Sequence, residues 1–296
     1  MTRTVLFAKT LLVLAALAAS ARAAGLPNPF YAMDTAFQRP GLTQDQQFDL
    51  VKSLGYPGVA WHEQSPAQAK AAVADLEGRG LKMFSIYCAA KVTPAGELTH
   101  SPTLVELMRT LKGHGTTIWL HVGGKGPAFD TLTGKEPLVA TLRSLAETAA
   151  ANDLHVAIYP HLGEWTARFA DATRLAKLVN HPQFGVSFNL CHCLAAGDEE
   201  RIPTLLKEAR PVLLHVQING ADRGVSGGQW KRLIQPLGKG SFDVGGLLVQ
   251  LKQLGYAGPI AFQGYGIPDD ARSILVPTME AWRKLSAAAG ADSTEK

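Results

Sequence analysis

The sequence predicts a (β/α)8 barrel, in which eight parallel strands form a closed ring inside a layer of helices. Short apolar runs, of the kind that form strands buried on both faces, alternate with helix-like runs along the chain. Seven of the eight strand-like runs are followed by a clear helix-like run, and the third by a longer loop before its helix. This alternation is typical of the barrel, and the chain after the leader fits the barrel's size class of about 250 residues. We therefore expect an α/β protein with one domain over residues 24–286.

Each predicted strand and helix can be placed along the chain. The strands are short and apolar, at 30–34, 58–61, 81–87, 117–122, 155–159, 184–189, 212–218 and 259–263. The helices are expected at 43–54, 66–79, 102–112, 136–151, 167–179, 199–209, 244–254 and 269–285. A doubly wound open sheet is the alternative, but no Gly-x-Gly-x-x-Gly turn follows the first strand. Residues 287–296 are small and polar, which predicts a flexible tail.

Residues 1–23 are predicted to be a secretory signal peptide. Arg3 and Lys9 make the start positive, residues 10–19 form an apolar run too short to span a bilayer, and Ala-Arg-Ala at 21–23 fits a cleavage site. An uncleaved anchor is the alternative. We therefore expect a periplasmic or secreted protein, with no membrane insertion after cleavage. Removing these residues takes away three basic and no acidic side chains, so the formal charge falls from +4 to +1 and nucleic-acid binding loses its support.

Ionisable side chains gather where the predicted strands end, which is where a (β/α)8 barrel builds its site. The fifth strand stops at Pro160, which cannot donate to a sheet, and His161 and Glu164 follow. Four of the nine histidines lie at four different strand ends, and we expect at least two to be functional: His62, His121, His161 and His192. Imidazole suits both acid–base chemistry and metal ligation.

Aromatic residues also lie near these strand ends: Trp61, Tyr87, Tyr159, Trp165, Trp230 and Tyr265. A cavity lined by aromatic rings and amides suits a sugar, because the rings pack on its C–H faces and the amides bond its hydroxyls. For Trp61 and Tyr87, ordinary barrel packing is the alternative. The three cysteines are expected to be small buried groups, and Cys191 or Cys193 beside His192 is only a weak metal signal.

Four motifs in the second half resemble the xylose-isomerase-like TIM barrels, the superfamily of sugar (phosphate) isomerases and epimerases. Residues 185–192 are similar to the family's Gly-Val-x-x-Asp-x-x-His strand, and residues 215–219 to its His-Val-His-x-x-Asp strand. Residues 237–243 resemble its Gly-x-Gly-x-x-Asp run, and residues 254–263 its Gly-Tyr-x-Gly-x-x-x-x-Glu strand. The resemblance covers nearly all of the chain after the leader and implies a carbohydrate as the small-molecule ligand.

The chain departs from the family at the metal ligands. Family epimerases hold a divalent metal with Glu, Asp, His and Glu, and the matching positions here are Tyr159, Asn189, Gln217 and Gln263. A hard cation prefers anionic oxygens, so we expect no family metal and assign no metal ligand; the cofactor is left open. His192 matches the family's substrate-contacting histidine, and Arg223 matches a substrate-contacting arginine.

Three functions are compatible with this pattern. The first is an isomerase, epimerase or lyase that abstracts a proton next to the carbonyl of a keto-sugar, the second is an enzyme with a rebuilt histidine-rich metal site, and the third is a non-catalytic sugar-binding barrel. For the first, the catalytic candidates are His161, His192, Tyr159 and Lys125. The candidates for substrate binding are Arg223, Asn189, Gln217, Gln263, His121, His62, Glu63, Tyr87, Trp61 and Tyr265.

Overall fold

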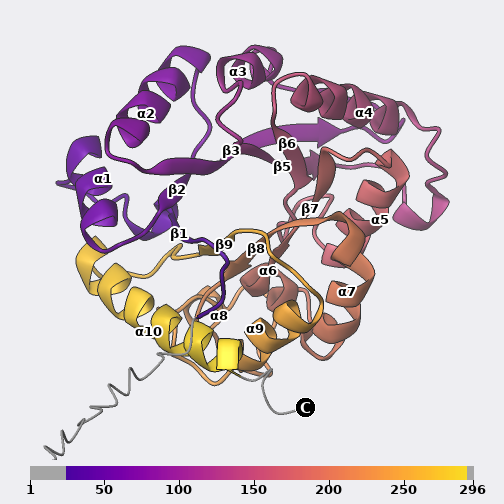
Figure 1. Ribbon diagram of the computed structural model, residues 1–296. Coiled ribbons are helices and arrows are strands. Elements are labelled where there is room, and N and C mark those ends of the chain that lie inside the picture. Colours follow the sequence, from indigo (N-terminus) through magenta and orange to yellow (C-terminus); the bar gives the residue numbers. More distant parts are fainter. Residues whose placement is uncertain (1–24, 292–296) are drawn as a thin grey trace, which may run out of the picture.

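Eight parallel strands form a closed ring with helices packed around it in the computed structural model, which describes residues 25–291 (Figure 1). The strands follow the order β2-β1-β9-β8-β7-β6-β5-β3, and β2 also pairs with β3, which closes the ring. The barrel prediction is therefore confirmed, and the open sheet is excluded by this last pairing. The predicted signal peptide and residues 292–296 lie outside the described residues.

The strands lie within a few residues of the predicted positions. They are β1 (Phe30–Met33), β2 (Gly58–Trp61), β3 (Lys82–Val92), β4 (Leu98–His100), β5 (Thr117–Gly124), β6 (His155–Ile158), β7 (Phe184–Asn189), β8 (Leu213–Ile218) and β9 (Ile260–Phe262). The strand β4 was not predicted. It pairs antiparallel with the end of β3 outside the ring, because β3 continues to Val92 rather than ending at Tyr87.

The helices occupy the predicted stretches, with two additions. They are α1 (Gln44–Ser53), α2 (Pro66–Gly78), α3 (Leu104–Thr110), α4 (Pro137–Ala150), α5 (Phe169–Val179), α6 (Leu190–Ala195), α7 (Ile202–Ala209), α8 (Trp230–Leu233), α9 (Val244–Gln253) and α10 (Ala271–Ala291). Short 3-10 turns lie at Asp34–Ala36, Phe129–Thr131, Glu199–Arg201 and Arg210–Val212. Neither α6 nor α8 was expected. None of the helices within 25–291 is long and apolar enough to cross a membrane.

The last helix corrects the prediction of a tail that begins at residue 287. Helix α10 continues to Ala291, and Ser286 and Ala289 are buried against the rest of the protein. The residues are small, and small side chains let a helix pack closely. At the start of the chain, Thr43 and Ser65 each form a capping box with the glutamine three residues later, which fixes where α1 and α2 begin.

Two apolar layers surround the strands. The side chains inside the ring form one cluster: Tyr31, Met33, Ala60, Trp119, Ala157, Tyr159 and Ala261. A larger cluster fills the space between the ring and the helices. Because side chains alternate along a strand, Ala60 faces the ring interior and Trp61 faces the helices, where it packs on Phe37 and Phe48. The interior of the ring is filled by side chains, so a ligand can bind only beyond the ends of the strands.

Candidate functional site

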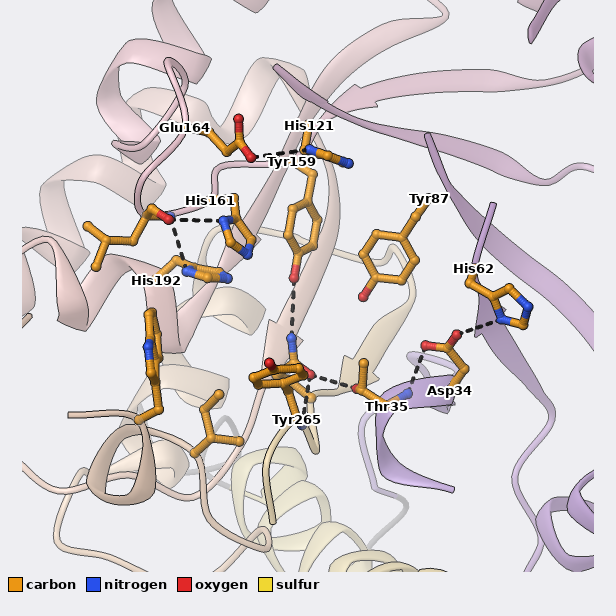
Figure 2. Close-up of a pocket in the computed structure, with 14 residues that line it drawn as sticks. Asp34, Thr35, His62, Tyr87, His121, Tyr159, His161, Glu164, His192 and Tyr265 are labelled. Carbon is orange, nitrogen blue, oxygen red and sulfur yellow. Dashed lines mark hydrogen bonds and ion pairs between the residues drawn. The ribbon is translucent and has the colours of Figure 1, made fainter. Parts of the chain in front are cut away.

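A cavity of about 540 Å³ opens at the end of the barrel where the strands finish. Its walls come from the segments that follow β1, β2, β6, β7, β8 and β9, together with Tyr87 on β3 and His121 on β5 (Figure 2). The residues that line it are Asp34, Thr35, His62, Tyr87, His121, Tyr159, His161, Leu162, Glu164, His192, Trp230, Ile234, Gln263 and Tyr265. The four strand-end histidines predicted from the sequence all belong to this one cavity.

Tyr159 forms the floor of the cavity. Its hydroxyl oxygen accepts hydrogen bonds from the amide nitrogens of Asn189, at 2.5 Å, and Gln263, at 3.3 Å. Burial raises the pKa of Tyr159 well above its ordinary value, against the lowering effect of Tyr87 and of the two amides. The phenol is therefore protonated at neutral pH and can donate a hydrogen bond.

The neighbours of the two amides fix which way each amide points. The side-chain oxygen of Asn189 accepts from the backbone N–H of His192 (3.4 Å), where Asn189 caps α6. The side-chain oxygen of Gln263 accepts from the Thr35 hydroxyl (2.8 Å) and from the backbone N–H of Tyr265 (3.1 Å). A backbone N–H can only donate, so each amide must turn its NH2 group toward Tyr159.

His161 and His192 form one wall, with ring centroids 4.2 Å apart. The Nδ1 atom of His161 lies 3.0 Å from the carbonyl oxygen of Leu162, and the Nδ1 atom of His192 lies 3.2 Å from the Leu162 backbone nitrogen. Burial, with a smaller contribution from the nearby His161, lowers the pKa of His192 to about 3. Loss of solvation also lowers the pKa of His161, while Glu164 opposes this effect.

Two acid–imidazole pairs lie elsewhere on the rim. On the opposite side of the cavity in Figure 2, His62 bonds the buried carboxylate of Asp34 at 3.0 Å. Above Tyr159, the Nδ1 atom of His121 lies 3.8 Å from the Glu164 carboxylate. Both pairs combine a charged acceptor with an imidazole, and such pairs can hold hydroxyl groups of a ligand.

An aromatic and apolar lip completes the cavity. Trp230, at the start of α8, packs edge-on against His192 with ring centroids 5.3 Å apart. Tyr265 follows β9, is 61% exposed, and is the one large hydrophobic side chain found exposed within 25–291. Leu162 and Ile234 also line this part. These surfaces suit the C–H faces of a sugar ring, as the sequence predicted for Tyr265 and Tyr87.

Four predicted site residues do not line the cavity. Lys125 is exposed beyond the rim, because β5 pairs with β3 as far as Gly124 and carries the next residue past the mouth. The side chain of Glu63 is exposed and does not line the cavity. Trp61 is buried between β2 and α1 and serves packing, the alternative that the sequence left open.

Arg223 is the fourth predicted site residue that does not line the cavity. The loop after β8 carries it out to the turn before α7, where its guanidinium pairs with Glu199 at 3.1 Å and approaches Glu200 at 3.8 Å. It lines a separate surface hollow that includes Phe242 and Gln250. The spacing to Gln217 placed it correctly in the chain, but the path of the loop decides which surface it reaches.

Asn189 and Gln217 were predicted to bind substrate, but both are buried below the cavity and do not line it. Asn189 acts through Tyr159, as described above. Gln217 is fully buried in β8, and neither atom of its amide has a hydrogen-bond partner among the described residues. Of the positions that replace the family's metal ligands, only Tyr159 and Gln263 touch the cavity.

The donor set at these positions does not fit a hard divalent cation. It consists of one phenol and three amides, none of which carries a negative charge. Two of the amides also turn their N–H groups, rather than oxygens, toward the point that Tyr159 occupies. Within residues 25–291 no group of three or more His, Cys, Asp or Glu side chains is placed to hold a metal ion. We therefore derive no chemical step through a metal here.

Several residues that line the cavity received no role from the sequence. Asp34 ends the first predicted strand and Glu164 follows the fifth, but neither acid was given a role, whereas Trp230 was already among the aromatic residues suited to a sugar. Thr35, Leu162 and Ile234 have no signal in the sequence. Leu162 contributes its backbone N–H and carbonyl groups, and any residue other than proline has the same two groups.

The fold and the site at the C-terminal mouth define a (β/α)8 barrel with an open pocket lined by polar, aromatic and apolar side chains. A model of the xylose isomerase-like TIM barrel family matches residues 48–285, so the chain belongs to this family. The resemblance seen in the motifs is thereby confirmed. No curated protein sequence matches the chain significantly.

Three solved structures illustrate the likeness, and at these identities it shows the fold alone. The 3-keto-D-glucoside 4-epimerase from E. coli is 16% identical, with a TM-score of 0.59 over 87% of this chain and 99% of its own. The D-psicose 3-epimerase from Clostridium cellulolyticum H10 is 15% identical, with a TM-score of 0.58 over 88% and 96%. A xylose isomerase-like TIM barrel/4-hydroxyphenylpyruvate dioxygenase fusion protein is 19% identical, with a TM-score of 0.61 over 87%, but this chain spans 42% of it.

Proposed function

We propose that this protein is an exported enzyme that moves a proton next to the carbonyl of a keto-sugar, without the family's divalent metal. The reaction class is isomerisation, epimerisation or elimination. The observation that carries the proposal is the Tyr159 hydroxyl, which accepts from two amides of fixed orientation and lies on the floor of the cavity. With both lone pairs engaged, its O–H is free to donate to a ligand.

Enolisation needs a base at carbon and a hydrogen-bond donor at oxygen. A neutral imidazole of the His161–His192 pair removes the proton from the carbon beside the carbonyl, and that C–H electron pair becomes the new C=C bond. The carbonyl oxygen gains negative charge, which the Tyr159 hydroxyl stabilises by hydrogen bonding. Isomerisation or epimerisation returns the proton to carbon, and elimination instead expels a β-oxygen.

The rest of the cavity supports a sugar as the substrate. Its volume lies in the range of small-molecule sites, and polar pairs and aromatic surfaces face each other across it. Two proteins of the same fold are a 3-keto-D-glucoside 4-epimerase and a D-psicose 3-epimerase, and both of these sugars are keto-sugars. Export, supported by the leader-like residues 1–23, favours a free sugar or glycoside over a phosphorylated one.

The experiment is deuterium exchange into methyl 3-keto-β-D-glucoside and D-psicose, followed by NMR after the protein has been treated with a chelator. Tyr159→Phe removes only the hydroxyl, and we expect it to slow exchange about 100-fold or more. The matched control is Lys125→Met, because Lys125 is exposed away from the cavity and its loss should change nothing. Full activity of Tyr159→Phe, or exchange that the chelator abolishes, would contradict the proposal.

A sugar-binding protein without catalysis is the second candidate. The amides at 189, 217 and 263 favour it, because amides do not shuttle protons and Gln263, which lines the cavity, can hold a hydroxyl group. Calorimetry with the same two sugars separates the candidates, since tight binding without any deuterium exchange would support this one. For the third candidate, a rebuilt histidine-rich metal site, no cluster of three or more His, Cys, Asp or Glu side chains is placed to hold a metal ion among the described residues. Metal analysis of the purified protein tests this candidate directly.

A further inference from the structure

The backbone of one residue, Leu162, contacts both histidines of the cavity wall, through a carbonyl that accepts and an N–H that donates. The carbonyl oxygen of Leu162 lies 3.0 Å from Nδ1 of His161, and the Leu162 N–H points at Nδ1 of His192 at 3.2 Å. A carbonyl can only accept a hydrogen bond, so Nδ1 of His161 must carry a proton. A backbone N–H can only donate, so Nδ1 of His192 must be bare.

We propose that the backbone of Leu162 holds the two imidazoles in opposite tautomers. His161 is then the base of the site through its bare Nε2, and His192 is a hydrogen-bond donor through its Nε2–H. The assignment rests on the proposed function and divides the work within it. A neutral imidazole has one N–H and one bare nitrogen, and fixing Nδ1 therefore fixes Nε2.

Burial keeps the His192 ring neutral, loss of solvation lowers the pKa of the more exposed His161, and the Nε2 atom of each ring is left for a ligand. His192 is 5% exposed, and its burial lowers its pKa to about 3. Both rings line the cavity, and neither Nε2 has another recorded hydrogen bond within residues 25–291. Figure 2 shows the two imidazoles beside Tyr159. Their ring centroids lie 6.4 Å (His161) and 6.0 Å (His192) from the centroid of the Tyr159 ring.

The division gives each group a separate atom of the substrate. The proton leaves carbon for Nε2 of His161, and the imidazolium that forms is stabilised by the Leu162 carbonyl and by the nearby Glu164 carboxylate. His192 Nε2–H and the Tyr159 O–H then donate to substrate oxygens, which gain charge as the C–H bond breaks. Leu162 is a positioning residue, because it acts through its backbone and through the two imidazoles.

The tautomers can be observed without any substrate. Protein labelled with 15N-histidine is examined by long-range 1H–15N correlation at neutral pH, and His161→Asn and His192→Asn assign the two rings by loss of their signals. We expect the proton on Nδ1 in His161 and on Nε2 in His192. The same tautomer in both rings would overturn the proposal, whatever the protein does to sugars.

Amide substitutions then test the roles. Asparagine can keep the contact to Leu162 at either position but has no group at the place of Nε2, whereas glutamine puts an N–H there and no base. With methyl 3-keto-β-D-glucoside in D2O, we expect His192→Gln to keep exchange within about tenfold of the parent and His192→Asn to lose about 100-fold.

At position 161 both substitutions should lose about 100-fold or more, because neither amide is a base. A tolerated His161→Gln together with an inactive His192→Gln would show that the roles are reversed. Thermal unfolding of all four variants checks that each is folded. Should the parent protein exchange neither sugar while the NMR shows the expected tautomers, the proposed reaction fails and the tautomer assignment stands.

Discussion

A single oxygen atom joins three strands of the barrel at the residue scale. Tyr159 follows β6, Asn189 ends β7 and Gln263 follows β9, and the two amides meet at the Tyr159 hydroxyl. The family resemblance places a metal ion among the same positions. Here a hydrogen-bonded phenol occupies that place, so the strand ends are held together by neutral donors and acceptors. A change to any one of the three alters the environment of the other two.

This arrangement predicts the result of restoring one carboxylate. Gln263→Glu should not create a manganese site, because Tyr159, Asn189 and Gln217 still supply no negative charge. The same change replaces the N–H that Gln263 donates to Tyr159 with an oxygen, so deuterium exchange into a keto-sugar should fall about tenfold. Calorimetry with manganese measures the first effect, and Gln263→Met is the control for loss of the amide. Stoichiometric manganese binding by Gln263→Glu would show that the position remains part of a metal site.

Side-chain chemistry at strand ends could be predicted from the sequence, and loop paths could not. His62, His121, His161 and His192 were identified because they directly follow apolar runs, and the ends of parallel strands meet at one rim. Lys125 and Arg223 were misplaced because each lies in a loop whose direction depends on tertiary contacts. For Lys125 the cause is the extension of β5, and for Arg223 it is the ion pair with Glu199.

At the scale of elements, the loops after β1 and β9 act as one unit over the cavity. The guanidinium of Arg39 donates to the carbonyl oxygens of Thr35 and Gln38 on one loop and of Ile267 and Asp269 on the other. The second loop carries Tyr265, whose backbone N–H bonds the side-chain oxygen of Gln263. Arg39 therefore fixes the aromatic lip relative to Asp34 and Thr35, although its own side chain lies outside the cavity.

Replacing Arg39 should loosen this unit without breaking the barrel. Arg39→Met removes four hydrogen bonds at a partly exposed site, and we expect the free energy of unfolding to fall by about 2 kcal/mol. Hydrogen exchange of residues 264–270 should become faster, while exchange in the strands keeps its order.

The matched control for this test is Arg272→Met. Arg272 is exposed at the start of α10, and no hydrogen bond or ion pair of its side chain is recorded among the described residues. Equal exchange rates in the two variants would mean that Arg39 does not hold the loop.

Unpredicted elements have short-range causes that a periodic pattern does not record. Helix α6 begins directly after β7 because the side chain of Asn189 caps it, whereas the sequence placed a helix only from residue 199. The strand pair β3–β4 forms because β3 runs on past the ring to Val92. Both differences matter for the site, since α6 presents His192 and the β3 extension pairs with β5 as far as Gly124, which places Lys125 beyond the mouth.

At the scale of the whole molecule, the sequence specified the barrel because its signal is repeated. Eight strand–helix units must agree for the ring to close, so an error of two residues at one boundary leaves the architecture unchanged. The site depends on single contacts instead, such as the two hydrogen bonds that the backbone of Leu162 makes with His161 and His192. Such contacts have no repeated pattern, and they become visible only when the ring has brought the strand ends together.

The closed ring also buries two histidines in neutral form, and this predicts how stability depends on pH. His215 lies inside the barrel between Tyr31 (2.9 Å) and Thr117 (2.8 Å), and burial lowers its pKa to about 3, as it does for His192. In the unfolded chain both titrate near 6.5. Below that pH the unfolded state binds more protons than the folded state, so stability falls as pH falls toward 3 and is unaffected by these groups above about pH 7.

From pH 6.5 to pH 5, before most carboxylates titrate, each of the two histidines should remove about 1.5 kcal/mol from the free energy of unfolding. Urea unfolding at half-unit steps measures the slope. His192→Gln removes one of the two contributions and should make the slope about half as steep, with His215 left in place. If the parent protein were equally stable at pH 6.5 and pH 5, these imidazoles would have to bind protons in the folded state as readily as they do in the unfolded chain. The tight packing of the barrel interior would then have to open at that pH.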